Sequence, residues 1–272
     1  MNSNSHAQSA QSIFDRAKST PTPQQTPAPK KSAEPNEPPK IDDPLADGTA
    51  ASEQGAGFTT GTGFFVDDSG HLVTAAHIVS SCIPTSIKIR GFDKNIITAK
   101  RLTVDTRNDL ALLRIDNKNT KHLQLNLTPQ LGEDVYAFGY PLFGELAQSG
   151  NFTAGIVTSL SGIKEDTTRF QISAPIQSGN SGGPVFDQKG NVVGIVLSRL
   201  TSKTDAVQNV NFALRSRLVE IFLSSNGIIP SISKESDMAL TKTEIASKGQ
   251  ASAVLVGCEV PPPKKKDNEK NN

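Results

Sequence analysis

Charge is nearly balanced in this chain of 272 residues, which carries 28 basic and 27 acidic side chains and a formal net charge of +1. A nucleic-acid surface needs an excess of positive charge, and no cluster of Lys and Arg with interleaved aromatic residues occurs. The only dense basic run, Lys264–Lys266, lies in a polar stretch and is best explained as a solvated end. The sequence therefore predicts no nucleic-acid partner.

Long apolar runs are also missing. No stretch reaches the length needed to span a bilayer, so no membrane span is predicted. The first residues, Met1–His6, lead into polar sequence without a basic flank or an apolar block, so no signal peptide is visible. The two cysteines, Cys82 and Cys258, are too few for a disulfide scaffold, and they could form one bridge or stay unrelated thiols.

Proline is scarce in the middle of the chain because it is concentrated near the ends. Eight of the 17 prolines lie between Pro21 and Pro44, and three more form Pro261–Pro263. Residues 1–56 are rich in Gln, Ser, Thr, Pro, Lys and Glu and have little to bury, so we predict a disordered arm or linker. Residues 259–272 are predicted to be a disordered tail for the same reason.

The middle of the chain shows short strand-like runs that end in Gly, Asn or Asp. The predicted strands are 58–66, 71–76, 86–89, 96–104 and 110–115, followed by 134–139, 150–160, 169–172, 183–186, 192–197 and 209–214. The polar stretch 117–130 separates them into two series of similar size. This all-β pattern predicts two β units, at about 57–122 and 131–214.

The apolar period changes after Ala213. Apolar residues from Leu214 to Phe222 share one helical face and Asn226-Gly227 ends the run, which predicts a helix over about 215–225. A weaker helical pattern covers 240–248, and 253–258 is a credible last strand. We expect 226–258 to be a C-terminal extension that packs on the β units of a domain spanning 57–225.

The most distinctive stretch is Gly179–Pro184, with the sequence GNSGGP. Its glycines let the backbone turn tightly, point several N–H groups to one side and leave the hydroxyl of Ser181 clear of neighbouring Cβ atoms. This shape suits a nucleophile beside an oxyanion site, although a glycine-rich turn between strands is an alternative. A nucleophilic serine also needs a base and an orienting acid.

Candidates for the base and the acid are few. Among four histidines, His77 follows a predicted strand, a position from which a rigid scaffold could aim an imidazole. By itself it would more often be a hydrogen-bonded structural residue. Asp109 stands at the head of an apolar strand and by itself would be interpreted as a turn residue.

Taken together, three segments resemble the catalytic segments of trypsin-like, chymotrypsin-fold serine proteases, in the same order of His, Asp and Ser. They are Thr74–His77 (TAAH), Asn108–Leu113 (NDLALL) and Gly179–Pro184. Their spacing is similar to that of the compact bacterial HtrA-like branch, and so are 155–160 and 211–214. The resemblance covers roughly 57–214 and implies an all-β fold of two six-stranded antiparallel barrels.

The resemblance also implies a mechanism. Ser181 would attack the scissile carbonyl, His77 would take and return its proton, and Asp109 would orient the imidazole. Backbone N–H groups of the loop Gly179, Asn180 and Ser181 would form the oxyanion hole, chiefly those of Gly179 and Ser181. The substrate would be a polypeptide, and neither a metal nor an organic cofactor is required.

Two departures from digestive members of the superfamily are informative. Asn180 stands where those members have an aspartate that pairs with a newly cut N-terminus, so activation by such a cut is not expected. Pro175 stands where cleavage after Lys or Arg relies on an acid, which predicts a shallow apolar S1 pocket for small aliphatic side chains. Ordinary loop packing is the alternative for Pro175 and Ile176. The predicted substrate-binding residues are Pro175, Ile176, Gln177, Ser178, Leu197, Ser198 and Arg199.

Some properties follow only from the resemblance or stay open. In some bacterial peptidases of this kind a cysteine after the histidine helix and one in a terminal strand recur, which implies a bridge between Cys82 and Cys258 and an oxidising compartment.

HtrA-like chains usually continue into a PDZ domain, and the residues after Leu214 are too few for the predicted helix plus such a module. Family habit favours the cell envelope or periplasm, whereas no export signal is visible. The compartment and the oligomeric state stay open.

The sequence thus favours a serine endopeptidase that acts through His77, Asp109 and Ser181. A catalytically quiet, protease-like binding module is the alternative from a different class. A hydrolase of small esters with the same fold is a third.

Overall fold

The computed structural model describes residues 49–50, 57–116, 121–141, 150–199, 211–234 and 238–262. All of them belong to one unit of the chain, Asp43–Asn272. Most of the expected N-terminal arm and the tail beyond residue 262 lie outside the described residues. Within the expected arm, β1 (Thr49–Ala50) is a short strand that pairs with β2 (Gly57–Phe65).

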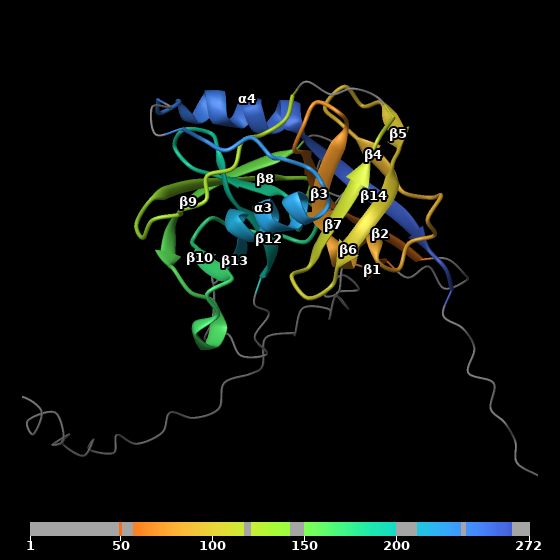
Figure 1. Cartoon of the computed structure of the whole chain (residues 1–272), viewed down its shortest axis with the longest axis horizontal. Helices are drawn as coiled ribbons and strands as arrows, with labels where there is room; N and C mark the ends of the chain where they lie inside the picture. Colours follow the sequence, from red (N-terminus) through yellow and green to blue (C-terminus); the bar gives the residue numbers. More distant parts are fainter. Residues whose placement is uncertain are drawn as a thin grey trace, which may run out of the picture. The chain divides into compact units, whose positions relative to one another are not determined.

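The first β unit is an eight-stranded antiparallel sheet (Figure 1). Besides β1 and β2 it contains β3 (His71–Ala75), β4 (Lys88–Arg90), β5 (Ile96–Thr98), β6 (Lys100–Asp105), β7 (Leu110–Arg114) and β14 (Ala253–Val260). The strands follow the order β5-β4-β14-β2-β3-β7-β6, with β1 beside β2. The two end strands, β5 and β6, are separated in the chain only by Ala99, so one bent stretch of chain joins the two edges of the sheet.

The second β unit is a closed six-stranded barrel in the order β10-β13-β12-β11-β8-β9. Its strands are β8 (Asp134–Gly139), β9 (Asn151–Ser159), β10 (Arg169–Ile172), β11 (Pro184–Phe186), β12 (Val192–Arg199) and β13 (Asn211–Arg215). The short 3₁₀ turn η2 (Ile163–Glu165) lies between β9 and β10. The second unit is thus the six-stranded barrel that was expected. The first unit is an open sheet, because its edge strands β5 and β6 do not pair with each other among the described residues.

The C-terminal extension is part of the first sheet. Strand β14 lies between β2 and β4 and pairs with β2 along its whole length, from Ala253 opposite Phe64 to Val260 opposite Gly57. Helix α4 (Lys242–Ser252) leads directly into it and begins with a capping box formed by Thr241 and Glu244. The extension was expected to pack on the β units. It instead supplies a strand inside the first sheet, hydrogen-bonded on both sides.

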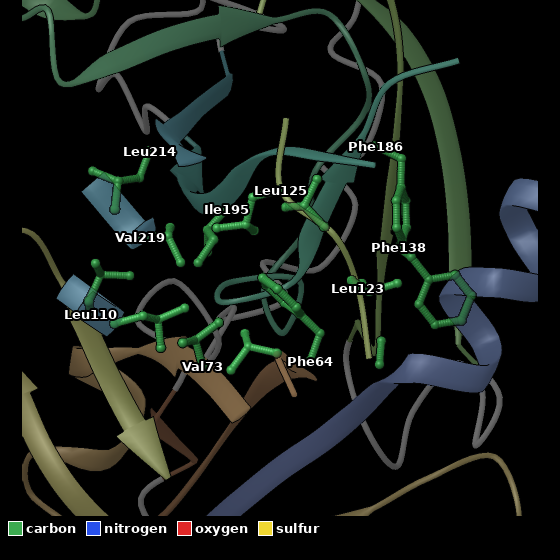
Figure 2. Close-up of a cluster of buried hydrophobic side chains, with 14 of the residues drawn as sticks. Phe64, Val73, Leu110, Leu123, Leu125, Phe138, Phe186, Ile195, Leu214 and Val219 are labelled. Carbon is green, nitrogen blue, oxygen red and sulfur yellow. The ribbon is translucent and has the colours of Figure 1, made fainter. Parts of the chain in front are cut away.

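Buried side chains form three clusters, one inside each β unit and one between them. Figure 2 shows the cluster between the units, in which Phe64, Val73 and Leu110 of the first sheet face Ile195 and other residues of the second barrel. Strand β7 is apolar at successive positions because both of its faces are buried. Leu110 and Leu112 belong to the cluster between the units, whereas Ala111 and Leu113 belong to the first unit's own cluster.

The connector and the helices complete the described fold. Leu123 and Leu125 of the polar connector are fully buried in the cluster between the units, and residues 117–120 lie outside the described part. Helix α3 (Ser216–Ser225) follows β13, close to the predicted bounds, and α2 (Ala76–Val79) is a single turn after β3. None of the described helices is long and apolar enough to cross a membrane.

Candidate active site

Pairing between β3 and β7 brings His77 and Asp109 together. The last pair of this ladder joins Ala75 to Leu110, so the residues just after β3 and just before β7 lie at the same edge of the sheet. His77 follows in α2, and Asp109 directly precedes Leu110. Two segments 32 residues apart in the sequence are therefore held side by side by a buried ladder.

The Asp109 carboxylate holds the imidazole and the start of α2 at once. Its Oδ2 lies 2.7 Å from His77 Nδ1, and its Oδ1 accepts a 2.8 Å hydrogen bond from the His77 backbone N–H. The Asp109 carbonyl also accepts from the Ala76 N–H at 3.0 Å. The His77 side chain is 48% exposed and that of Asp109 is 26% exposed, so the imidazole is held on one side and open on the other.

Asp109 adopts a left-handed backbone conformation, with φ at +57°. This region is unfavourable for most residues other than glycine, although aspartate is enriched there. The three hydrogen bonds from Ala76 and His77 stabilise this conformation. Such local strain is common where a side chain must be aimed for function.

The turn before Asp109 is organised by Asp105. Its carboxylate accepts hydrogen bonds from the Arg107 and Asn108 N–H groups and from the Asn108 side chain. Burial alone would raise the pKa of Asp105, but the hydrogen bonds from Asn108 and Arg107 outweigh it, and the pKa lies below its ordinary value. The ionised form of Asp105 therefore fixes the turn that delivers Asp109.

The loop that carries Ser181 is a tight turn. The Asn180 N–H donates to the Gln177 carbonyl at 3.0 Å, with Gly179 at φ +92° in the third position, as in a type II turn. Gly182 has φ at +83°, and a Cβ there would lie 2.2 Å from the Thr62 carbonyl oxygen. The glycines predicted to shape this loop are thus required by backbone conformation and by close contact with β2.

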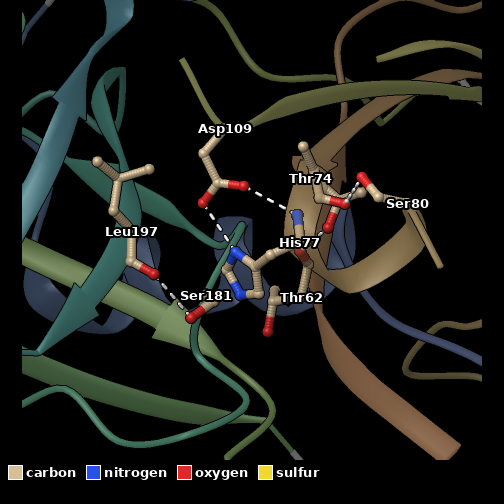
Figure 3. Close-up of polar contacts among 8 residues, drawn as sticks. Thr62, Thr74, His77, Ser80, Asp109, Ser181 and Leu197 are labelled. Carbon is tan, nitrogen blue, oxygen red and sulfur yellow. Dashed lines mark hydrogen bonds and ion pairs between the residues drawn. The ribbon is translucent and has the colours of Figure 1, made fainter. Parts of the chain in front are cut away.

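The Ser181 hydroxyl lies near the His77–Asp109 pair. Figure 3 shows the imidazole between the Asp109 carboxylate and Ser181. The hydroxyl donates to the Leu197 carbonyl on β12 at 2.8 Å. No hydrogen bond joins the two described side chains of Ser181 and His77. The structure thus brings the three predicted residues to one place, with the serine turned toward β12.

The part of the chain that carries this arrangement is similar to known proteins. Residues 61–195, which include His77, Asp109 and Ser181, match the family described as trypsin-like peptidase domain. This part of the chain is a trypsin-like peptidase domain. Among solved structures, a serine endoprotease from Yersinia pestis is similar, with 26% identity and a TM-score of 0.53 over 61% of this chain and 56% of that chain.

Curated relatives of the trypsin-like domain include HtrA-like proteases. The serine protease Do-like HtrB of Bacillus subtilis is 34% identical over 164 residues, 56% of this chain and 34% of that protein. A probable periplasmic serine endoprotease DegP-like of Pseudomonas fluorescens is 35% identical over 154 residues, 55% of this chain and 31% of that protein. The uncharacterized protein y4bJ of Sinorhizobium fredii is 42% identical over 201 residues, 72% of this chain and 31% of that protein. The chain thus spans about a third of the length of these relatives.

The residues predicted to contact substrate surround the serine loop of the trypsin-like domain. Pro175, Gln177 and Ser178 are exposed, whereas Ile176 is 4% exposed and belongs to the cluster inside the second barrel. The side chain of Ile176 therefore packs in the barrel. Leu197 is also buried and offers its carbonyl, and Ser198 and Arg199 continue β12, with side chains outside the described part.

A disulfide joins Cys82 to Cys258, with the two Cα atoms 5.7 Å apart. Cys82 follows α2, which carries His77, and Cys258 lies in β14. Nearby, the Ile83 N–H donates to the Glu259 carbonyl at 2.9 Å. The bridge thus fastens the C-terminal strand to the chain segment just after the imidazole.

Thr62 is a residue near Ser181 that the sequence analysis did not single out. It is fully buried in β2 and contacts the serine loop through both its backbone and its hydroxyl. The available signal was its place between Gly61 and Gly63, since glycines inside a strand often mark close approach of another backbone. Within the described ranges, no group of three His, Cys, Asp or Glu side chains is placed to hold a metal ion.

Proposed function

We propose that this chain is a serine endopeptidase that hydrolyses peptide bonds through Ser181, His77 and Asp109. The observation that carries the proposal is the doubly held imidazole. Asp109 binds His77 at Nδ1 and at the backbone N–H, which leaves Nε2 as the basic nitrogen on the open side of the ring, next to the serine loop. The match to the trypsin-like peptidase family and the HtrA-like relatives supports the same reaction.

The reaction begins when the Ser181 hydroxyl leaves the Leu197 carbonyl and turns to His77 Nε2. Its oxygen forms a bond to the substrate carbonyl carbon, and its proton passes to Nε2. Collapse of the tetrahedral adduct breaks the C–N bond, and His77 returns the proton to the departing amine. Water then attacks the acyl-enzyme ester by the same route, which frees the new carboxylate and restores Ser181.

Backbone N–H groups in the serine loop stabilise the negative charge of the adduct. Within the described part of the chain, neither the N–H of Gly179 nor that of Ser181 donates to another residue. Both are therefore free to donate to an oxyanion. A donor of this kind typically contributes about 3 kcal/mol to transition-state stabilisation.

Substrate binds beside β12 and presents a small aliphatic side chain to the S1 pocket. The segment Pro175–Ser178, which we expect to form one wall of this pocket, contains no acidic residue. This wall therefore offers no carboxylate to pair with a Lys or Arg side chain of the substrate. The side chains of Ala174 and Ile176 are buried in the cluster inside the second barrel, so neither adds a polar group to this wall. We therefore expect cleavage after residues such as Val, Ala and Ile.

Incubation with an unfolded protein tests this function. With reduced, carboxymethylated lactalbumin, we expect new peptides whose C-terminal residues are mainly Val, Ala or Ile, measured by mass spectrometry. The variant Ser181→Ala should produce none. Hydrolysis of small esters without any peptide product would support the esterase alternative, and binding without cleavage would support the quiet module. Cleavage mainly after Arg or Lys would contradict the specificity alone.

A further inference from the structure

Four hydrogen bonds hold Thr62 between the first sheet and the serine loop: two to the loop, one from Thr74 on β3 and one from Tyr140 just after β8. Its backbone N–H donates to the Ser181 carbonyl at 2.8 Å, and its own carbonyl accepts from the Thr74 hydroxyl at 2.7 Å. Its hydroxyl donates to the Gly179 carbonyl at 2.7 Å and accepts from the Tyr140 N–H at 2.9 Å. Figure 3 shows Thr62 beside Ser181 and His77.

The direction of the hydroxyl proton is fixed by its neighbours. A backbone N–H can only donate, so the Thr62 oxygen must accept from Tyr140. The single hydroxyl proton is then used for the Gly179 carbonyl, which can only accept. Because Thr62 is fully buried, water cannot replace either partner without a rearrangement of the loop.

The carbonyl that Thr62 holds belongs to the peptide between Gly179 and Asn180. This peptide lies between the two N–H groups proposed for the oxyanion hole, those of Gly179 and Ser181. Among the described residues no donor bonds to the buried Oδ1 of Asn180, so within this part of the chain that oxygen does not fix the loop. The peptide is thus held at two points, its N–H by the Gln177 carbonyl at 3.0 Å and its carbonyl by the Thr62 hydroxyl, which is the side-chain contact.

We propose that Thr62 is a positioning residue for the oxyanion hole: its hydroxyl holds the Gly179 carbonyl so that the N–H groups of Gly179 and Ser181 converge on the substrate. The proposal rests on the proposed function, because it concerns the transition state of that reaction. Thr62 touches neither substrate nor reacting atoms and acts through the loop. Without this hydrogen bond the Gly179 carbonyl is held less firmly, so the loop would bind substrate normally but stabilise the adduct poorly.

Steady-state kinetics on a peptide cleaved by the wild type test this role. Thr62→Val keeps the shape and removes the hydroxyl, and we expect kcat to fall about 10- to 100-fold with KM within about twofold. Thr62→Ser keeps the hydroxyl and should restore kcat to within about threefold of the wild type. The rate of phosphonylation by a fluorophosphonate, which also places an oxygen in the oxyanion hole, should follow kcat across the three proteins.

A second variant separates positioning from stability. Ser216→Ala removes another fully buried hydroxyl, one at the start of α3 that donates to the Asn126 carbonyl of the connector. It should lower Tm by a few degrees, as Thr62→Val should, and leave kcat unchanged. If Thr62→Val is unfolded at the assay temperature, Thr62→Ala at a lower temperature carries the same expectation.

Three results would overturn the role of Thr62. They are a Thr62→Val variant with kcat within twofold of the wild type, a loss that appears only in KM, or an equal loss in Thr62→Ser. An inactive wild type would instead contradict the proposed function. The two proposals therefore fail in distinguishable ways.

Discussion

Asp109→Asn is expected to lower kcat by about 10⁴-fold while the protein stays folded. The carboxylate oxygen 2.7 Å from His77 Nδ1 fixes the tautomer with the basic nitrogen at Nε2. An asparagine can instead donate to Nδ1, which favours the tautomer with a proton on Nε2 and removes the base. It also loses the charge that stabilises the imidazolium. Kinetics on a cleaved peptide, together with a thermal melt, measure both effects.

A second His–Asp pair in the same domain provides a matched control. The Asp67 carboxylate lies 2.6 Å from His71 Nδ1 and accepts from the His71 backbone N–H at 3.0 Å, the same two contacts that Asp109 makes with His77. Asp67→Asn should therefore have a similar effect on local structure and leave kcat unchanged. Equal activity of Asp109→Asn and Asp67→Asn would show that Asp109 has no role in catalysis.

Removal of the disulfide is expected to lower stability by about 5 kcal/mol at most. Cys82 and Cys258 are 176 residues apart in the sequence, and the entropy of closing so long a loop sets this upper value, whereas native bridges typically contribute 2–5 kcal/mol. For a domain of this size the loss corresponds to a Tm lower by roughly 10 °C. Differential scanning fluorimetry of the double variant Cys82→Ala, Cys258→Ala measures it.

Reduction supplies the control for the disulfide. Dithiothreitol should lower the Tm of the wild type toward that of the double variant and leave the double variant unchanged. Under non-reducing conditions the wild-type mass should be about 2 Da below that of the reduced chain. Two free thiols in the folded, air-exposed protein, or the same Tm for all four samples, would contradict a stabilising bridge.

Local patterns predicted most of the strands because the alternation of apolar residues is a local property. The predicted bounds 134–139 and 169–172 agree with β8 and β10, and His77 and Asp109 stand beside the strand ends where they were predicted. The predicted run 96–104 is divided by Ala99 into β5 and β6, which pair with different neighbours. A bend of this kind depends on those neighbours, which the run itself does not specify.

The partners that each strand pairs with at long range could not be predicted from the sequence. The apolar pattern of 253–258 indicates a strand, but nothing in it specifies that β2 and β4 are its partners, because backbone hydrogen bonds carry no residue identity. Likewise, Leu123 and Leu125 stand in a polar connector, and their burial depends on the two β units meeting there. At the site, Thr62 was missed because its role depends on a loop 117 residues away.

Covalent labelling of Ser181 tests the central claim most directly. A fluorophosphonate should react with the folded wild type by forming a bond between phosphorus and Ser181 Oγ, with loss of fluoride, as the His77–Asp109 pair accepts the serine proton. We expect one adduct per chain, mapped to the peptide that contains Ser181. The adduct should be absent from Ser181→Ala and from the denatured protein. A folded wild type that stays unlabelled, or a label on another serine, would contradict a nucleophilic Ser181.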